Sequence, residues 1–80
     1  MSVSSKVKAV LNIKGKDHKQ LADFLKISSQ ALSNKFYRDS FSAEDLIKIA
    51  DFLGCGLAFI IDDAQRVVLD KSDIKEKKEK

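Results

Sequence analysis

The chain is organised around residues 17–38, which read DHKQLADFLKISSQALSNKFYR. Apolar residues recur at helical spacing in the first half of this stretch, at Leu21, Ala22 and Leu25. A break follows at residues 26–27, and a second amphipathic helix begins at Ser28. Two helices of about eight to ten residues joined by a tight turn have the layout of a helix-turn-helix. In that layout four apolar side chains face inward: Leu21, Leu25, Ile27 and Leu32.

The second helix of this motif displays short or planar hydrogen-bonding side chains that carry no charge: Ser29, Gln30, Ser33 and Asn34. Such groups suit the edges of bases in a DNA major groove, where Gln and Asn can each bind adenine through two hydrogen bonds. The pattern therefore predicts a surface that binds double-stranded DNA.

Helices are also predicted on both sides of the motif. Residues 2–13 carry Val and Leu at helical spacing behind Ser residues that can cap a helix. Asp17, followed three residues later by Gln20, has the pattern of a capping box. Residues 42–54 run from a Ser N-cap to a Gly that ends the helix, and Phe41 before them is expected to enter the core. Because the apolar stripe of this last helix is wide, we expect it to be buried on more than one side.

Charge is distributed unevenly along the chain. Residues 1–38 hold eight Lys and Arg against two Asp, whereas residues 39–70 hold two basic residues against seven acidic ones. The basic segment contains the predicted DNA-reading helices, as attraction to phosphates requires. We therefore expect the basic segment to face nucleic acid and the acidic segment to face away from it. The alternative interpretation is an ordinary solvated surface.

Several functional classes find no support in the sequence. No apolar run approaches the ~18 residues of a membrane span, and the single Cys excludes an internal disulfide and is typical of a reducing cytoplasm. One His and one distant Cys offer no metal site. Asp62 and Asp63 lie in a predicted turn, where Asp is common for conformational reasons. We therefore expect a cytoplasmic protein that is not an enzyme and needs no metal or other cofactor.

The apolar pattern changes from helical to strand-like after residue 56. Residues 57–61 and 66–69 flank a short polar loop, which predicts a β-hairpin. Both faces of its first strand are apolar, so we expect the helical core to cover one face and a second copy of the chain to cover the other. The predicted dimer contacts are Leu57, Phe59, Ile60, Ile61, Val67, Val68 and Leu69. The alternative is that the hairpin folds over its own helices.

Residues 7–55 resemble the lambda-repressor-like helix-turn-helix family, which is also known as the Cro/repressor or XRE type. The matching segments are QLADFLKIS, SQALSNK and FSAEDLIKIADFLGC. The run SAEDLIKIADFLG stands where that family has its fourth helix, and SNKFYRDSF before it is similar to a subgroup carried by phages and integrative elements. The resemblance implies a mainly α fold, a four-helix DNA-binding domain followed here by the hairpin.

The resemblance also implies roles for individual residues. Base contacts fall on Ser29, Gln30 and Asn34, with Ser33 beside them, and a phosphate contact falls on His18. From their charge or their place in the motif, we expect further phosphate contacts from Lys19, Ser28, Lys35 and Arg38. For His18 the alternative is an exposed side chain without a role. This chain departs from the family at two positions: Lys26 stands where a Gly is usual, and Lys35 stands where an apolar residue is usual. We expect Phe36 to fill that part of the core instead and to release Lys35 and Arg38 towards the phosphates.

These observations divide the chain into three parts and predict one main function. Residues 1–55 form the DNA-binding domain, residues 56–70 the dimerising hairpin, and residues 71–80 a charged, disordered tail. The predicted function is that of a sequence-specific transcriptional regulator, a repressor, acting as a homodimer on an inverted-repeat operator. The alternative is a protein-interaction module, such as an adaptor or an antitoxin, that uses the same fold to bind a partner protein.

Overall fold

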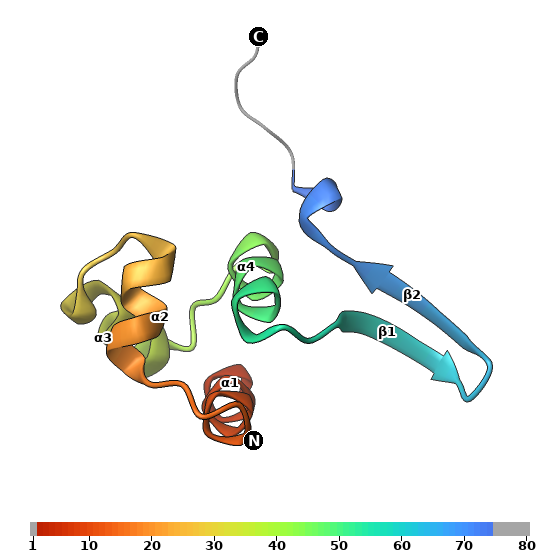
Figure 1. Cartoon of the computed structure of the whole chain (residues 1–80), viewed down its shortest axis with the longest axis horizontal. Helices are drawn as coiled ribbons and strands as arrows, with labels where there is room; N and C mark the ends of the chain where they lie inside the picture. The colour runs from red at the N-terminus through yellow and green to blue at the C-terminus, as the bar shows by residue number, and fades with distance from the viewer. Residues whose placement is uncertain (1, 75–80) are drawn as a thin grey trace, which may run out of the picture.

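The computed structural model describes residues 2–74. They form four α-helices, a two-stranded antiparallel hairpin and a short 3-10 helix: α1 (Val3–Ile13), α2 (His18–Leu25), α3 (Ser29–Arg38), α4 (Ala43–Leu53), β1 (Leu57–Asp62), β2 (Gln65–Leu69) and η1 (Lys71–Asp73). Figure 1 shows the four helices gathered together and the hairpin projecting away from them. The predicted mainly α fold, with four helices followed by a hairpin, is confirmed.

The helix ends follow the local signals in the sequence. Each of the four α-helices has a Ser or Asp at its N-cap whose side chain accepts a backbone N–H of the first turn: Ser2, Asp17, Ser28 and Ser42. The predicted capping box of α2 is present, because Gln20 also accepts the N–H of Asp17 at 3.0 Å. α2 ends at Leu25, and its C-cap Lys26 adopts the left-handed conformation (φ 62°) that Gly adopts most easily. A side chain there costs about 1 kcal/mol relative to Gly.

The core lies where α1, α2, α3 and α4 meet. Leu21 of α2 and Leu32 of α3 have no exposed surface, and Ala22 is 1% exposed where α2 and α3 cross. The buried cluster contains Val7, Leu11, Leu21, Ala22, Leu32, Ile49 and Leu53. Leu25, Ile27, Phe36 and Phe41 pack against that cluster, as predicted. The core therefore contains the apolar side chains predicted within residues 17–38, whereas Val3, at the apolar spacing of the first helix, is 41% exposed.

α4 is buried on two sides, as the width of its apolar stripe predicted. Ile49 and Leu53 belong to the core cluster shared with α1, α2 and α3. Ile47 and Ala50 are also buried, but they line a shallow pocket on another side of α4, next to Leu69. α4 therefore connects the helical core to the base of the hairpin.

The hairpin differs from its prediction in what covers it. Its strands pair with Phe59 opposite Val67 and Ile60 opposite Arg66, and its turn is closed by Asp62, whose carboxylate accepts the N–H groups of Ala64 and Gln65. The expectation that the helical core covers one face is wrong beyond the base of the hairpin, and the hairpin does not fold over its own helices. The reason is the short connection at residues 54–56, after which β1 runs away from α4. Five apolar side chains are consequently more than half exposed: Phe59, Ile60, Ile61, Val67 and Val68.

The segment after the hairpin is more ordered at its start than predicted. Lys71–Asp73 form a 3-10 helix capped by Asp70, and the ammonium group of Lys71 lies 3.6 Å from the carboxylate of Asp51 on α4. The remainder of the predicted disordered tail, residues 75–80, lies outside the described residues. No helix in the described part of the chain is long and apolar enough to cross a membrane.

Candidate nucleic-acid interface

The exposed face of α3 carries the side chains that the sequence singled out for base contacts. Ser29, Gln30, Ser33 and Asn34 are all exposed. Gln30 and Asn34 lie one turn apart, and the Gln30 amide donates a 3.4 Å hydrogen bond to the Asn34 side-chain oxygen. These polar groups face outward because Leu32, on the opposite side of the same helix, is fully buried. α3 therefore presents a polar surface of donors and acceptors that nothing in the described structure covers.

Tyr37 extends this exposed face by one turn. It lies three residues after Asn34, which places the two on the same side of an α-helix. Its side chain is 89% exposed. The sequence reasoning did not select Tyr37, although its spacing from Gln30 and Asn34 was a signal that it shares their face.

His18 connects the start of α2 to α3. Its Nε2 lies 3.1 Å from the carbonyl oxygen of Ser29 and 3.3 Å from the hydroxyl oxygen of Ser33. Because a carbonyl oxygen can only accept, the first contact is a hydrogen bond in which the ring N–H donates. The ring also packs 5.8 Å from that of Phe36, measured between centroids. His18 therefore has a structural contact with α3, and the alternative of a side chain without a role does not describe it.

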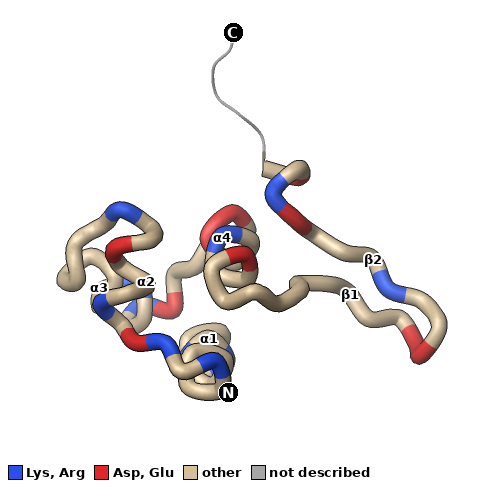
Figure 2. The backbone as a smooth tube through the Cα atoms, in the orientation of Figure 1, with Lys and Arg blue, Asp and Glu red and all other residues tan. Residues whose placement is uncertain are grey.

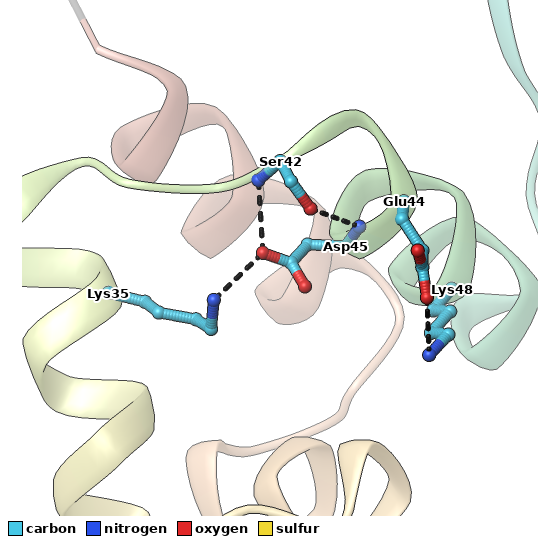
Figure 3. Close-up of polar contacts among 5 residues, drawn as sticks. All are labelled: Lys35, Ser42, Glu44, Asp45 and Lys48. Atoms are coloured by element: carbon cyan, nitrogen blue, oxygen red, sulfur yellow. Dashed lines mark hydrogen bonds and ion pairs between the residues drawn. The ribbon is translucent and has the colours of Figure 1, made fainter. Parts of the chain in front are cut away.

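Lys35 is held by α4. Its ammonium group donates to the Asp45 carboxylate at 2.9 Å, and the same carboxylate oxygen accepts the backbone N–H of Ser42 at 3.0 Å (Figure 3). Burial alone would raise the pKa of Asp45, but the hydrogen bonds from Ser42 and the charge of Lys35 outweigh it and lower that pKa below its usual 3.8. Phe36 fills the core as expected, yet Lys35 is not released from the protein as that expectation required. The sequence could not reveal this because Lys35 and Asp45 lie on different helices.

The C-terminal end of α3 is tied to the first turn of α1. The hydroxyl group of Ser4 donates to the carbonyl oxygen of Phe36 at 2.8 Å, and the Asp39 carboxylate accepts the N–H of Ser4 at 2.7 Å. Hydrogen bonding to Ser4 lowers the pKa of Asp39 below its usual 3.8. Ser4 is the buried polar residue of the described structure. Sequence reasoning missed this link, which joins residues 35 positions apart.

Basic residues surround the polar face of α3. Figure 2 shows Lys and Arg positions on α1, α2 and α3 and in their connections, with fewer acidic positions among them, and mainly acidic positions on α4 and at the tip of the hairpin. Lys19, Ser28 and Arg38 are exposed, as contact with phosphates requires. Lys8, not selected from the sequence, lies 5.4 Å above the Phe36 ring, next to His18 in a shared depression. This arrangement places positive charge beside the uncharged donors and acceptors of α3.

The described residues contain no group of three His, Cys, Asp or Glu side chains placed to hold a metal ion. Cys55 is exposed. The site therefore consists of hydrogen-bonding and cationic side chains on a helix-turn-helix.

Comparison with known families identifies this arrangement. Residues 3–62 match the model of a family described as the bacteriophage CI repressor helix-turn-helix domain. The matched span runs from the first residue of α1 to the last residue of β1. No curated protein matches the chain. No solved structure matches it either.

Proposed function

Because the chain belongs to the family of bacteriophage CI repressor helix-turn-helix domains, a family of DNA-binding regulators, we propose that it is a repressor that acts as a homodimer on an inverted-repeat operator. The observation that carries this proposal is the exposed polar face of α3 on a helix whose opposite side is locked into the core. The protein would work in the cytoplasm of a bacterial host, where its DNA is found.

α3 is the element that enters the major groove in this proposal. Gln30 and Asn34 bind base edges, with Ser29 and Ser33 beside them, because planar amides can form paired hydrogen bonds with adenine. Their mutual 3.4 Å hydrogen bond aligns the two amides along one face of the helix and would be exchanged for bonds to bases.

Phosphate contacts set the orientation of α3 on the duplex. We assign them to His18, Lys19 and Ser28, which lie at the N-terminal ends of α2 and α3, where free N–H groups favour phosphates, and to Arg38 at the other end of α3, whose positive charge attracts them. Lys35 adds to the positive potential, but a direct phosphate contact would require it to exchange its ion pair with Asp45.

The dimer contacts in this proposal belong to the hairpin: Leu57, Phe59, Ile60, Ile61, Val67, Val68 and Leu69. A two-stranded hairpin with large exposed apolar side chains is marginal in water, and association with a second copy removes that surface from solvent. The hairpin lies away from α3 (Figure 1), so association through it leaves both DNA-binding faces free. Half-sites would be spaced by about one helical turn, or ~34 Å.

A band-shift titration tests the readout by α3. Gln30→Ala and Asn34→Ala should each reduce discrimination between operator and unrelated DNA by about 1–3 kcal/mol. Lys19→Ala is the matched control, because it should weaken binding to both DNAs equally. The operator for this experiment comes from selection of bound sequences from a random DNA pool. Unchanged discrimination by both amide variants would refute the proposed base contacts.

The exposed apolar hairpin also supports a second candidate function, an adaptor or antitoxin that binds another protein. Salt separates the two functions. DNA binding should weaken steeply with added salt because counterions are released, whereas a mainly apolar protein contact should change little.

A further inference from the structure

An apolar groove lies between α1 and α4, on the side where the hairpin leaves the helices. The α1–α4 groove is lined mainly by Val3, Val7 and Val10 of α1, Leu46 and Leu53 of α4, and Leu57 at the start of β1. Its volume is about 240 Å³, which is smaller than the roughly 300–1,000 Å³ of typical small-molecule pockets. Its size and apolar lining suit the side chains of a protein segment better than a polar metabolite.

One face of the hairpin is chemically matched to this groove. Cross-strand partners share a face, so Phe59 lies with Val67, and Leu57 lies with Leu69. We call these four residues the Phe59 face; all are apolar. The opposite face pairs Ala58 with Val68 and Ile60 with Arg66, so it carries a charged side chain among its apolar ones and is less suited to an apolar surface. Phe59 is 67% exposed and Val67 is 56% exposed, so the Phe59 face is uncovered beyond its base.

We propose that in the homodimer each hairpin places its Phe59 face in the α1–α4 groove of the other copy. This inference rests on the dimer proposed above and specifies its contacts. The hairpin cannot reach the groove of its own chain, because Leu57 both lines the groove and begins the strand that leads away from it. In a twofold dimer the contact between groove and hairpin forms twice, so the pair of contacts closes on itself.

The area of the hairpin supports the use of the groove. A strand of six residues is about 20 Å long and two strands are about 10 Å wide, so one hairpin face is small. A stable interface needs about 800 Å² of accessible surface from each partner. Two hairpins stacked on each other alone would fall short of that area. In the reciprocal arrangement each copy contributes a hairpin face and a groove, which doubles the number of contacts.

Charge is also complementary between the two surfaces. Lys6 lines the groove, and within residues 2–74 its ammonium group has no ion pair. The hairpin tip carries Asp62 and Asp63, and Asp62 is already engaged with the N–H groups of its own turn. Asp63 is therefore the carboxylate available to approach Lys6 when the hairpin lies along the groove. A partner with a basic tip would be repelled at this position.

Chemical cross-linking of the full chain tests this arrangement. Cys55 lines the groove, so a Val67→Cys variant carries one thiol in the groove and one on the Phe59 face. A short bismaleimide should join Cys55 of one copy to residue 67 of the other, which gives a covalent dimer on a denaturing gel; mass spectrometry of peptides from that dimer band identifies the joined residues. Arg66→Cys is the matched control, because residue 66 is adjacent but on the opposite face. It should give at most about a tenth of that cross-link, since its thiol points away from the groove.

A second variant fills the groove. A Cβ added at Gly56 meets no atom within 4 Å, and its φ is not in the left-handed range, so Gly56→Leu is compatible with the backbone. Its side chain should occupy the groove and raise the dimer dissociation constant about tenfold or more, as expected for the loss of one buried apolar contact. Ala9→Leu, on an exposed position of α1, adds similar apolar surface outside the groove and should leave the constant unchanged. Analytical ultracentrifugation measures both.

The outcomes separate this inference from the proposed function. A Cys55-to-67 cross-link together with weaker association of Gly56→Leu supports it. A dimer that instead joins residue 67 to residue 67 in a Cys55→Ser background, and that Gly56→Leu does not weaken, overturns the groove contact and keeps the homodimer. A chain that stays monomeric at all concentrations overturns both. Operator binding in the band shift is measured independently of these results.

Discussion

The exposed face of α3 and the hairpin are both uncovered, but their side chains relate to water in opposite ways. Gln30 and Asn34 on α3 can form hydrogen bonds with water. Leaving these amides exposed therefore costs little free energy and does not favour a permanent partner. The side chains of Phe59 and Ile60 on the hairpin cannot form such bonds, and leaving them in water forgoes about 1.5–3 kcal/mol each. The polar face is therefore suited to a ligand that comes and goes, and the apolar face to a lasting contact.

This difference matches the two interfaces proposed for this small domain. A surface that binds DNA must stay soluble without it and must discriminate through the direction of hydrogen bonds. A surface that holds two copies together gains from the non-directional burial of apolar area. Figure 1 shows the two surfaces separated by α4, so changes in one are expected to leave the other intact.

The largest effect is expected where an apolar side chain belongs to the core. Leu32→Ala should lower the free energy of unfolding by about 2–5 kcal/mol, because Leu32 is fully buried and its loss leaves a cavity. Ile60→Ala, in a hairpin position that is 74% exposed, should change the stability of the monomer by less than about 0.5 kcal/mol. Urea unfolding at a protein concentration that favours monomers measures both. Equal losses of unfolding free energy in the two variants would mean that the hairpin packs against the helices in solution.

The next largest effect comes from a comparison between the loss of an aromatic side chain from the hairpin and the loss of one from α3. Phe59→Ser should raise the dimer dissociation constant by roughly one to two orders of magnitude, because about 1.5–3 kcal/mol of apolar burial is lost. Binding of a single half-site should persist. Tyr37→Ser is the matched control: it removes an aromatic side chain that is 89% exposed on α3, so it should spare association and affect DNA binding alone. Sedimentation and band-shift titrations of both variants give the comparison, and loss of association in Tyr37→Ser would contradict it.

Sequence reasoning succeeded where structure depends on neighbours along the chain. Asp17 with Gln20 marked the start of α2, and Lys26 took the left-handed conformation that its place in the turn required. Such features involve residues within one turn of each other, whose chemistry is readable from spacing. The polar face of α3 was predictable for the same reason.

The features that sequence reasoning missed join distant segments. Ser4 with Asp39, and Lys35 with Asp45, each depend on how two helices are placed relative to one another. The direction of the hairpin also depends on packing, because its apolar pattern is compatible with folding back over the helices or with projecting from them. The periodicity of apolar residues indicates which side chains must be buried, but it does not identify the segment that buries them.

A smaller effect is expected from the ion pair that holds α3 against α4. Lys35 and Asp45 are about 30% and 19% exposed, so their pair should contribute about 1 kcal/mol or less to folding. The exposed pair of Lys48 and Glu44, within α4, should contribute less, about 0.3–0.5 kcal/mol. Double-mutant cycles to Ala in urea unfolding measure both couplings.

The same variants decide whether Lys35 contacts phosphate. If its ammonium group stays with Asp45, Lys35→Ala should leave the salt dependence of operator binding unchanged. If it binds a phosphate instead, the slope of log affinity against log salt should fall by about one. A reduced slope with no coupling to Asp45 would restore the original expectation that Lys35 is released towards DNA.

The smallest effect is expected on the stability of the fold as the pH is lowered. It compares a carboxylate at the end of α3 with one at the end of the hairpin. The pKa of Asp39 is lowered by its bonds to Ser4, and that of Asp70 by its bonds to Ser72. A carboxyl group whose pKa is lower in the folded chain stabilises the fold above its usual pKa of 3.8, and this contribution is lost as the pH falls through the folded value. Asp39→Asn should therefore be less stable than wild type at neutral pH, and the difference should shrink below about pH 4.

Asn is a suitable replacement because it tolerates the left-handed backbone at position 39 (φ 55°) and can still accept the N–H of Ser4, so that the change isolates the charge. Asp70→Asn should show the same trend in stability. Only Asp39→Asn should also weaken operator binding at neutral pH, because Asp39 anchors α3 to α1 whereas Asp70 caps the short helix after the hairpin. Unfolding curves between pH 2.5 and 7 on the two variants, with band shifts at pH 7, make the comparison. A stability difference that stays constant with pH would show that the carboxylate charge of Asp39 does not hold α3 in place.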